Sequence, residues 1–139
     1  MKSIIETLSA RGCFRTLLGT LDNSGVANEL SGAGPFTLFA PDDTAFNRRN
    51  VDELGDRDKM ALTLSYHIVA RACLATEMAN TDKLLTRSGK TLTVHMENGA
   101  TVIDNAKCIE HDIECSNGVV HVIDNVFLPQ LSGWYYPGL

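Results

Sequence analysis

Hydrophobic residues follow two different periods along the chain, one in each half. In the first third they recur at i, i+3, i+4 and i+7, the spacing that places them on one face of an α-helix. Beyond residue 90 they alternate with polar residues, which is the spacing of a half-buried β-strand. The clearest helical set is Phe14, Leu17, Leu18 and Leu21, and the clearest alternating set is Leu92, Val94 and Met96. This change of period predicts helices followed by a sheet.

Local signals divide the N-terminal half into short helices. Ser3 and Glu6 have the spacing of a capping box ahead of a first helix, and Gly12 is expected to end it. A second helix carries the helical set above, and residues 26–30 predict a third. Asp42 is in position to cap a fourth helix, because a carboxylate there can accept a backbone N–H at the positive helix end.

The pattern continues less regularly up to residue 90. Residues 51–54 predict a capped turn, and a longer helix is expected from Asp56 to about Val69. The apolar stripe of that helix is Met60, Leu64 and Ile68. Residues 78–85 are expected to form a loop or a short helix, and Ser88 with Gly89 predicts a turn.

The last predicted strand, within residues 116–129, is the one around which the chain is organised. Asn117 and Gly118 predict a tight turn before it, because both residues tolerate positive φ. Alternate positions are apolar on both faces, which indicates a strand buried on both sides. One face carries Val120, Val122, Val126 and Leu128, and the other carries Val119, Ile123 and Phe127. Pro129 is expected to close the strand.

Short turns join this strand to the strands that precede it. Strands are predicted at residues 91–96, 101–103 and 106–115, the last of them irregular in its middle, and a separate short strand at 37–40. Strands joined by short turns pair as antiparallel neighbours. The predicted class is α+β, with helices mainly in the N-terminal half packed against an antiparallel sheet formed mainly by the C-terminal half. Residues 1–139 are expected to form a single domain.

Three segments resemble the signature blocks of the fasciclin (FAS1) domain family. Residues 34–46, Gly-Pro-Phe-Thr-Leu-Phe-Ala-Pro-Asp-Asp-Thr-Ala-Phe, are similar to the first block. Residues 117–124, Asn-Gly-Val-Val-His-Val-Ile-Asp, are similar to the second, and Tyr66 with His67 matches the Tyr-His dipeptide between them. The resemblance implies a FAS1-like fold and a role in adhesion or surface-associated binding. The structural signature residues that it implies are Asp42, Asn117, Gly118, His121 and Asp124.

Composition narrows the classes of partner. The chain is 44% hydrophobic and 21% charged, with a formal net charge of −5, which argues against nucleic acid as the main partner because phosphate neutralisation needs a basic face. No apolar run reaches 18 residues, so no transmembrane segment is expected. Glu6, Thr7 and Ser9 interrupt any signal-peptide core near the N-terminus.

Four cysteines, Cys13, Cys73, Cys108 and Cys115, are expected to be free and mostly buried thiols. Cys108 and Cys115 are placed in one extended segment, where seven residues span roughly 23 Å, well beyond disulfide reach.

The Tyr-His dipeptide has two interpretations. His67 lies beside the apolar stripe of the predicted helix, where a histidine is usually a core residue bonded to backbone or carboxylate. The resemblance implies the other interpretation, in which Tyr66 and His67 form an adhesion motif that contacts a partner. We expect the structural role for His67, and a direct contact stays open for Tyr66.

The remaining polar candidates are expected to be structural. His121 shares its parity with apolar residues and is expected in the core, whereas His95 shares its parity with threonines and is expected to be exposed. His111 and Cys115 are too few for a zinc site, which needs three or four ligands, so no metal is expected. Asp42 and Asp43 are interpreted as a helix cap and its neighbour rather than as an acid–base pair.

The first functional hypothesis is a non-enzymatic adhesion or surface-attachment module without a cofactor. Its expected partner is a protein or a carbohydrate on a cell surface or matrix, with weak self-association as a further expectation. The alternatives are a carrier domain that binds a small molecule or polysaccharide in an apolar groove, and a hydrolase that uses His67 or His121 as a base. The resemblance implies an extracellular, periplasmic or cell-surface location, and a cytoplasmic location stays open.

Overall fold

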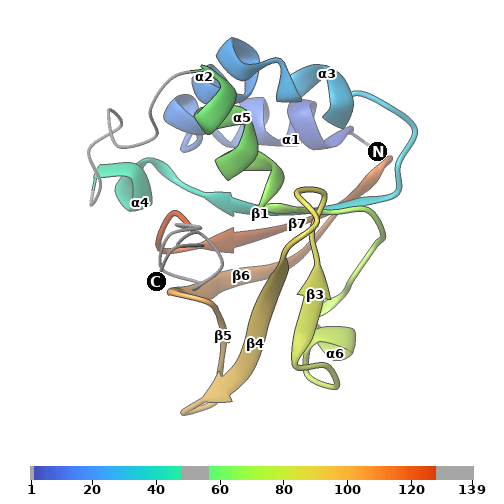
Figure 1. Ribbon diagram of the computed structural model, residues 1–139, viewed down its shortest axis with the longest axis vertical. Coiled ribbons are helices and arrows are strands. Elements are labelled where there is room, and N and C mark those ends of the chain that lie inside the picture. Colours follow the sequence, from blue (N-terminus) through green and yellow to red (C-terminus); the bar gives the residue numbers. More distant parts are fainter. Residues whose placement is uncertain (1, 48–56, 128–139) are drawn as a thin grey trace, which may run out of the picture.

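The computed structural model describes residues 2–47 and 57–127 of the chain (Figure 1). Its helices are α1 (Ile4–Arg11), α2 (Arg15–Ser24), α3 (Val26–Leu30), α4 (Asp43–Asn47), α5 (Arg57–Ser65) and α6 (Ala75–Met78). Its strands are β1 (Phe36–Pro41), β2 (Ile68–Val69), β3 (Lys83–Leu85), β4 (Thr91–Glu97), β5 (Ala100–Ile103), β6 (Ala106–Cys115) and β7 (Gly118–Ile123). The predicted order of helices followed by strands, and with it the α+β class, is confirmed.

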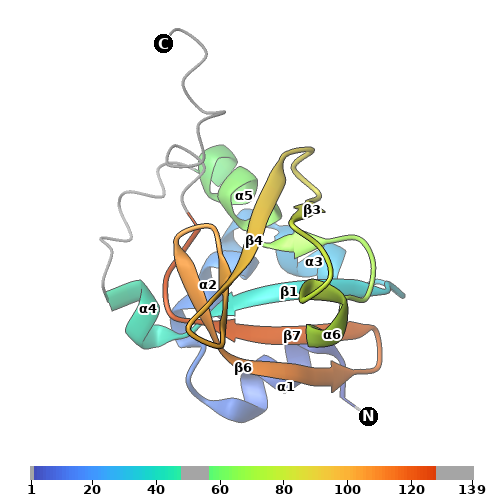
Figure 2. The same cartoon turned by 90° about the horizontal axis from the view of Figure 1, so that it is seen from below.

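The strands form one sheet in the order β2-β1-β7-β6-β5-β4-β3. The pairs β4–β5, β5–β6 and β6–β7 are antiparallel, as the short turns between them predict. β1 pairs with β7 in parallel, with Leu38 opposite Val120. The sheet is therefore mixed rather than wholly antiparallel, because the long connection between β1 and β7 does not fix their relative direction as a hairpin does. Figure 2 shows β1, β7 and β6 running side by side.

β7 is buried on both faces, as its sequence predicts. Val120 and Val122 join the helices in one hydrophobic cluster, and Ile123 joins β4, β5 and β6 in a second cluster on the opposite face. Figure 1 shows α1, α2, α3 and α5 above the layer of β1 and β7, and the hairpin of β4 and β5 below it, with α6 on that lower side. The strand therefore separates two cores, whereas Leu128 and Pro129 lie outside the described residues.

Several local predictions hold in detail. The Ser3 hydroxyl accepts a hydrogen bond from the Glu6 N–H at 3.2 Å, and the Glu6 carboxylate accepts one from the Ser3 N–H at 3.0 Å, which completes the capping box of α1. Gly12 ends this helix in the left-handed conformation, with φ of 74°. β6 is irregular in its middle, with register shifts on both sides of Glu110.

The helix expected to reach Val69 ends at Ser65, so this prediction was wrong. Ile68 and Val69 form β2 and pair with β1, where Ile68 lies opposite Leu38. Strand pairing with β1 therefore prevails over the helical spacing of the apolar stripe, and β-branched residues suit that pairing. The capped turn predicted at residues 51–54 and the Asp56 cap lie outside the described residues.

Two further predictions need correction. Residues 78–85 are not one loop or short helix, because α6 ends at Met78 and β3 follows at Lys83. The turn between β6 and β7 is formed by Ser116 and Asn117, and Gly118 is the first residue of β7. Asn117 does not have a positive φ, so the turn depends on its side chain rather than on a left-handed backbone.

Three of the four cysteines are buried, and all four are free thiols, with Cys13 exposed. Cys108 and Cys115 both lie on β6, as the predicted single extended segment requires. Within residues 2–47 and 57–127, no helix is long and apolar enough to cross a membrane.

Candidate functional site

Tyr66 and His67 lie just beyond the end of α5, in the interior between the helices and the hairpin of β4 and β5. We call the strands of this hairpin the lower strands. Both residues have 0% of their surface exposed. The His67 Nδ1 atom lies 2.8 Å from the Thr63 carbonyl oxygen, and the Phe127 N–H donates to His67 Nε2 at 3.0 Å. These two bonds assign the neutral tautomer that carries its proton on Nδ1. The ring therefore ties the end of α5 to the segment that follows β7.

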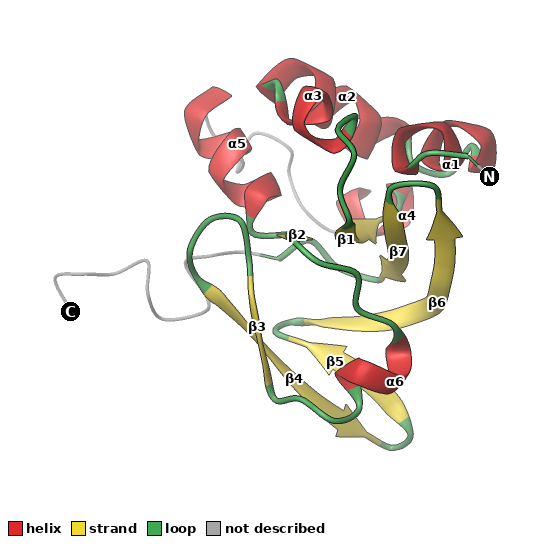
Figure 3. Cartoon of the chain, turned by 90° about the vertical axis from the view of Figure 1, so that its right-hand side faces the viewer, coloured by secondary structure: helices red, strands yellow, loops and turns green. Residues whose placement is uncertain are grey.

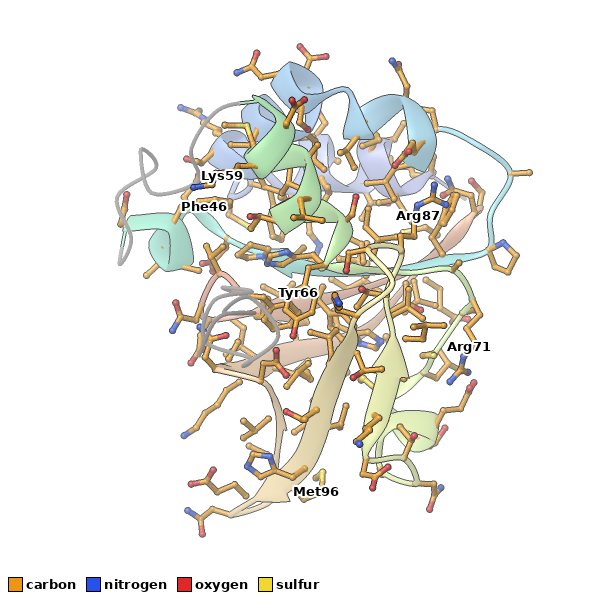
Figure 4. All side chains as sticks on the ribbon, viewed as in Figure 1. Phe46, Lys59, Tyr66, Arg71, Arg87 and Met96 are labelled. Atoms are coloured by element: carbon orange, nitrogen blue, oxygen red, sulfur yellow. The ribbon has the colours of Figure 1, made fainter. Side chains whose placement is uncertain are left out.

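The Tyr66 hydroxyl makes a second connection across the same region. It donates to Asp104 Oδ2 at 2.5 Å, while Asp104 Oδ1 accepts from the Thr93 N–H at 2.7 Å. Asp104 lies in the turn between β5 and β6 with a left-handed φ of 50°. The tyrosine thus connects the end of α5 to the lower strands, and Figure 4 labels it between these two parts of the molecule.

Both rings of the dipeptide pack on Phe127. The His67 ring stacks on it at 4.6 Å between centroids, and the Tyr66 ring meets it edge-on at 6.1 Å. Burial lowers the pKa of His67 to about 4, so the ring is neutral near pH 7. A direct contact of either ring with a partner would require this core to open, and the binding role of the dipeptide stays a prediction.

His121 occupies the interior on the same side of β7. Its Nε2 atom lies 2.7 Å from the Cys73 carbonyl oxygen, and its Nδ1 atom accepts from the Asp112 N–H at 3.1 Å. Its ring stacks on Phe39 at 5.6 Å between centroids. Burial lowers the pKa of His121, despite the Cys73 carbonyl and the nearby Asp112 carboxylate that favour its protonated form. Both ring nitrogens are therefore engaged with the backbone.

The other two histidines lie on the surface. His95 is exposed, as its parity predicts, and lies 3.4 Å from the Glu97 carboxylate. His111 is also exposed, with its Nε2 atom 3.4 Å from the Thr101 hydroxyl. Among the described residues, no three histidine, cysteine or carboxylate side chains come together in a way that could hold a metal ion.

The two adjacent carboxylates serve two different helices. Asp42 Oδ1 accepts from the Ala45 N–H at 2.9 Å in the first turn of α4. Asp43 Oδ1 accepts from the Thr16 N–H at 2.9 Å in the first turn of α2. The role of Asp43 was missed from the sequence, because its partner lies 27 residues away and no local pattern connects them.

Asn117 and Gly118 fix the turn that leads into β7. The Asn117 side chain donates to the Leu30 and Gly32 carbonyl oxygens at 2.7 and 3.0 Å, and accepts from the Ile4 N–H at 3.0 Å. A Cβ atom at Gly118 would overlap with the backbone of Phe36, so only glycine allows β1 and β7 to approach there. Both polar atoms of the Asn117 side chain thus bond to backbone groups of α1, α3 and the loop that follows α3.

Asp124 acts at the other end of β7. Its Oδ1 atom accepts from the Lys107 N–H at 2.8 Å, and its own N–H donates to the Lys107 carbonyl oxygen at 3.0 Å. The residues implied as structural signatures therefore all make contacts within the fold, either at helix ends or between β7 and its neighbours.

An open groove of about 490 Å³ lies at the end of the sheet where β7 begins. We call it the end groove. Three segments line it: the loop before β1 around residues 33–35, the connection into α6 at 72–77, and the β6–β7 turn at 114–119. Figure 3 turns this end of the molecule toward the viewer. Sequence patterns did not indicate the groove, because it forms only when these distant segments meet.

The family described as Fasciclin domain matches residues 12–129, which include all three segments that resemble its signature blocks. This chain belongs to the fasciclin domain family. The match contains β7, the Tyr-His dipeptide and all three segments that line the end groove.

Similar proteins include bacterial and animal members. Protein sll1483 of Synechocystis is 32% identical over 135 residues, which cover 93% of this fasciclin domain and 74% of that protein. Human periostin is 31% identical over 134 residues, which cover 92% of this chain but only 16% of periostin. A solved FAS1 domain pair from the insect cell adhesion molecule Fasciclin I has a TM-score of 0.78 at 20% identity, covering 93% of this chain and 51% of that one. The last similarity establishes the fold.

Proposed function

We propose that this fasciclin domain is a non-enzymatic binding module that acts in adhesion or surface attachment. The observation that carries the proposal is the family match over residues 12–129. The insect protein with the same fold is described as a cell adhesion molecule. The partner is a protein or a carbohydrate of a cell surface or matrix, and the site of action is extracellular or at the cell surface.

The two buried histidines favour a module whose surface, rather than a reactive side chain, makes the contact. His67 and His121 are both 0% exposed, and their ring nitrogens are bonded to backbone groups. In this proposal Tyr66 and His67 act indirectly, because they hold α5 and the lower strands in place beneath the surface that binds.

A hydrolase would need a histidine that reaches substrate in a cleft. Neither buried histidine lines the end groove. The two adjacent carboxylates, Asp42 and Asp43, are each occupied at a helix end. The geometry of the described residues therefore favours the binding module over the hydrolase.

An attachment assay tests the proposal. Beads coated with the purified domain are applied to cells and to matrix from the same source, and the retained fraction is measured under flow. We expect greater retention than for albumin-coated beads, and retention equal to that of the wild type for the surface variant Glu97→Gln, which changes an exposed carboxylate that does not line the end groove. If the circular-dichroism spectrum shows that the domain is folded, and beads coated with it are retained no better than albumin-coated beads, the proposal is contradicted.

A further inference from the structure

The end groove has walls that are held from several sides. The Thr37 hydroxyl donates to the Arg71 carbonyl oxygen and accepts from the Cys73 N–H, both at 2.7 Å. His121 lies 2.7 Å from the Cys73 carbonyl oxygen, and Asp112 accepts from the Ala75 N–H at 2.8 Å. The segment that forms one wall is thus tied to β1, β6 and β7 in turn.

The other two segments that line the groove, the loop before β1 and the β6–β7 turn, are also held in place by hydrogen bonds. Asn117 binds the carbonyl oxygens of Leu30 and Gly32, which fixes the loop before β1 against the β6–β7 turn. At Gly34 a Cβ atom would overlap with the Asn117 carbonyl oxygen, so the two segments approach as closely as backbone allows. A hollow with such walls is preorganised, which lowers the entropic cost of binding a partner.

The lining of the end groove has a defined chemical character. Its apolar part includes Pro35, Leu74 and Val119, and its charged lining residues are the carboxylates Glu77 and Glu114. No lysine, arginine or histidine is among the lining residues that the structure describes. The volume of about 490 Å³ falls within the roughly 300–1,000 Å³ that is typical of ligand sites.

The two carboxylates are not equivalent. Glu77 forms an ion pair with Arg71 at 3.1 Å, and both side chains are about half exposed. Figure 4 labels Arg71 on this side of the molecule. Glu114 is exposed and takes part in none of the ion pairs among the described residues. An added cation would therefore find one unpaired carboxylate and could share a second, in a chain whose net charge is −5.

We propose that the end groove binds an extended segment of a partner protein that carries lysine or arginine. The long stem of such a side chain covers apolar surface while its charged end stays at the wet rim. Pro35, Leu74 and Val119 supply the apolar surface, and Glu114 with Glu77 supplies the complementary charge. The inference rests on the proposed binding function and names the chemistry of the partner.

Direct binding of a probe peptide tests the inference. The probe is a short fluorescent peptide in which arginine alternates with alanine, and the reference is the same peptide with glutamate in place of arginine. Fluorescence anisotropy with the whole domain should detect the arginine peptide alone, with affinity that falls as ionic strength rises from about 0.01 M to about 1 M. Glu114→Gln should weaken binding about two- to fivefold, the effect of one exposed ion pair.

Two further variants separate the groove from the general acidity of the chain. Ala33→Trp places a large ring into the groove from an exposed loop position and should reduce binding below detection. Glu97→Gln removes the same charge as Glu114→Gln but lies outside the groove, so it should leave the affinity unchanged. Equal weakening by Glu97→Gln and Glu114→Gln would overturn the inference, as would tighter binding of the glutamate peptide.

The same variants distinguish this inference from the proposed function. If wild-type beads attach to cells and Ala33→Trp beads attach equally well, the groove is not the contact surface, although the adhesion proposal stands. If the arginine peptide binds but no bead is retained, the adhesion proposal fails and the groove remains a peptide site. A third outcome is that the wild-type domain self-associates but does not bind the arginine peptide, and that Glu114→Gln abolishes the self-association. This outcome would assign the groove to a second copy of the chain and overturn the inference.

Discussion

The two faces of β7 are buried in different chemical surroundings. On the helical side, Val120 and Val122 pack with apolar residues of the helices, and the buried hydroxyls of Thr20 and Ser24 donate to carbonyl oxygens of their own helix. On the opposite side, the cluster that contains Ile123 also contains Tyr66, and Phe127 and Phe39 of that cluster stack on His67 and His121. One strand thus separates a core without histidine from a core that includes two neutral histidines.

Because of this difference, we expect the stability of the two cores to respond differently to pH. The helical core depends on shape and on buried apolar area, which respond little to protonation. The opposite core also depends on hydrogen bonds that need a neutral histidine, because His67 and His121 each accept a backbone N–H with one nitrogen. Acid removes that acceptor and places a charge in the interior. Acid should therefore loosen the opposite core, which contains His67 and His121, before it loosens the helical core.

The largest expected effect compares one cavity in each core. Leu17→Ala on the helical side and Phe127→Ala on the other should each cost about 3–5 kcal/mol of unfolding free energy at pH 7. Both side chains are 0% exposed. Only Phe127→Ala uncovers His67, because the two rings stack at 4.6 Å. Urea denaturation at several pH values checks this pair of variants.

The two cavity variants should differ in their pH dependence. Water that enters the Phe127→Ala cavity should raise the pKa of His67 toward its ordinary value, so that this variant loses less stability on acidification than the wild type. Leu17→Ala should keep the pH dependence of the wild type. If the unfolding free energies of both variants change with pH in the same way, the two cores do not differ in their sensitivity to acid.

The second prediction concerns acid alone. His67 titrates near 6.5 in the unfolded chain and at about 4 in the folded protein, so the unfolded state binds the extra proton between these values. Stability is therefore full above about pH 6.5 and falls as the pH drops toward 4, by about 3 kcal/mol from this residue. The depressed pKa of His121 adds a loss of the same sign.

His67→Gln separates this loss from ordinary acid effects. Glutamine keeps a donor and an acceptor but does not titrate in this range. We expect the variant to be less stable than the wild type at pH 7 and to show a smaller change between pH 7 and pH 4. Denaturation curves that shift by the same amount for both proteins would rule out His67 as the source.

The third prediction removes a single hydroxyl group. Tyr66→Phe keeps the ring against Phe127 but loses the bond to the Asp104 carboxylate, and should cost about 1–2 kcal/mol. Attachment and peptide binding should match the wild type at a temperature where both proteins are folded. Loss of attachment with an unchanged melting temperature would instead show that the Tyr66 hydroxyl contacts the partner.

Sequence patterns predicted the parts of this fold that depend on near neighbours. The capping box of Ser3 and Glu6, the periodicity of α2 and the two apolar faces of β7 all follow from local spacing. Pairing across the fold overrode such spacing at Ile68, which lies opposite Leu38 in the sheet although it fits a helical stripe. The end groove could not be predicted, because it is formed by three segments whose meeting depends on the complete fold.

The smallest expected effect concerns the two capping residues Asp42 and Asp43. The sequence predicted the cap made by Asp42, which is local, but not the cap made by Asp43, which is long-range. Asp42→Ala removes the local cap of α4, and Asp43→Ala removes the carboxylate that caps α2 from 27 residues away. Each should cost about 1 kcal/mol, the usual effect of losing a cap. Asp82→Ala, at an exposed position in a bend, is the control and should change the unfolding free energy by less than about 0.5 kcal/mol. Because both helices belong to the helical side of the molecule, neither capping variant should alter the pH dependence attributed to His67. An Asp43→Ala protein as stable as the control would show that α2 does not need its distant cap.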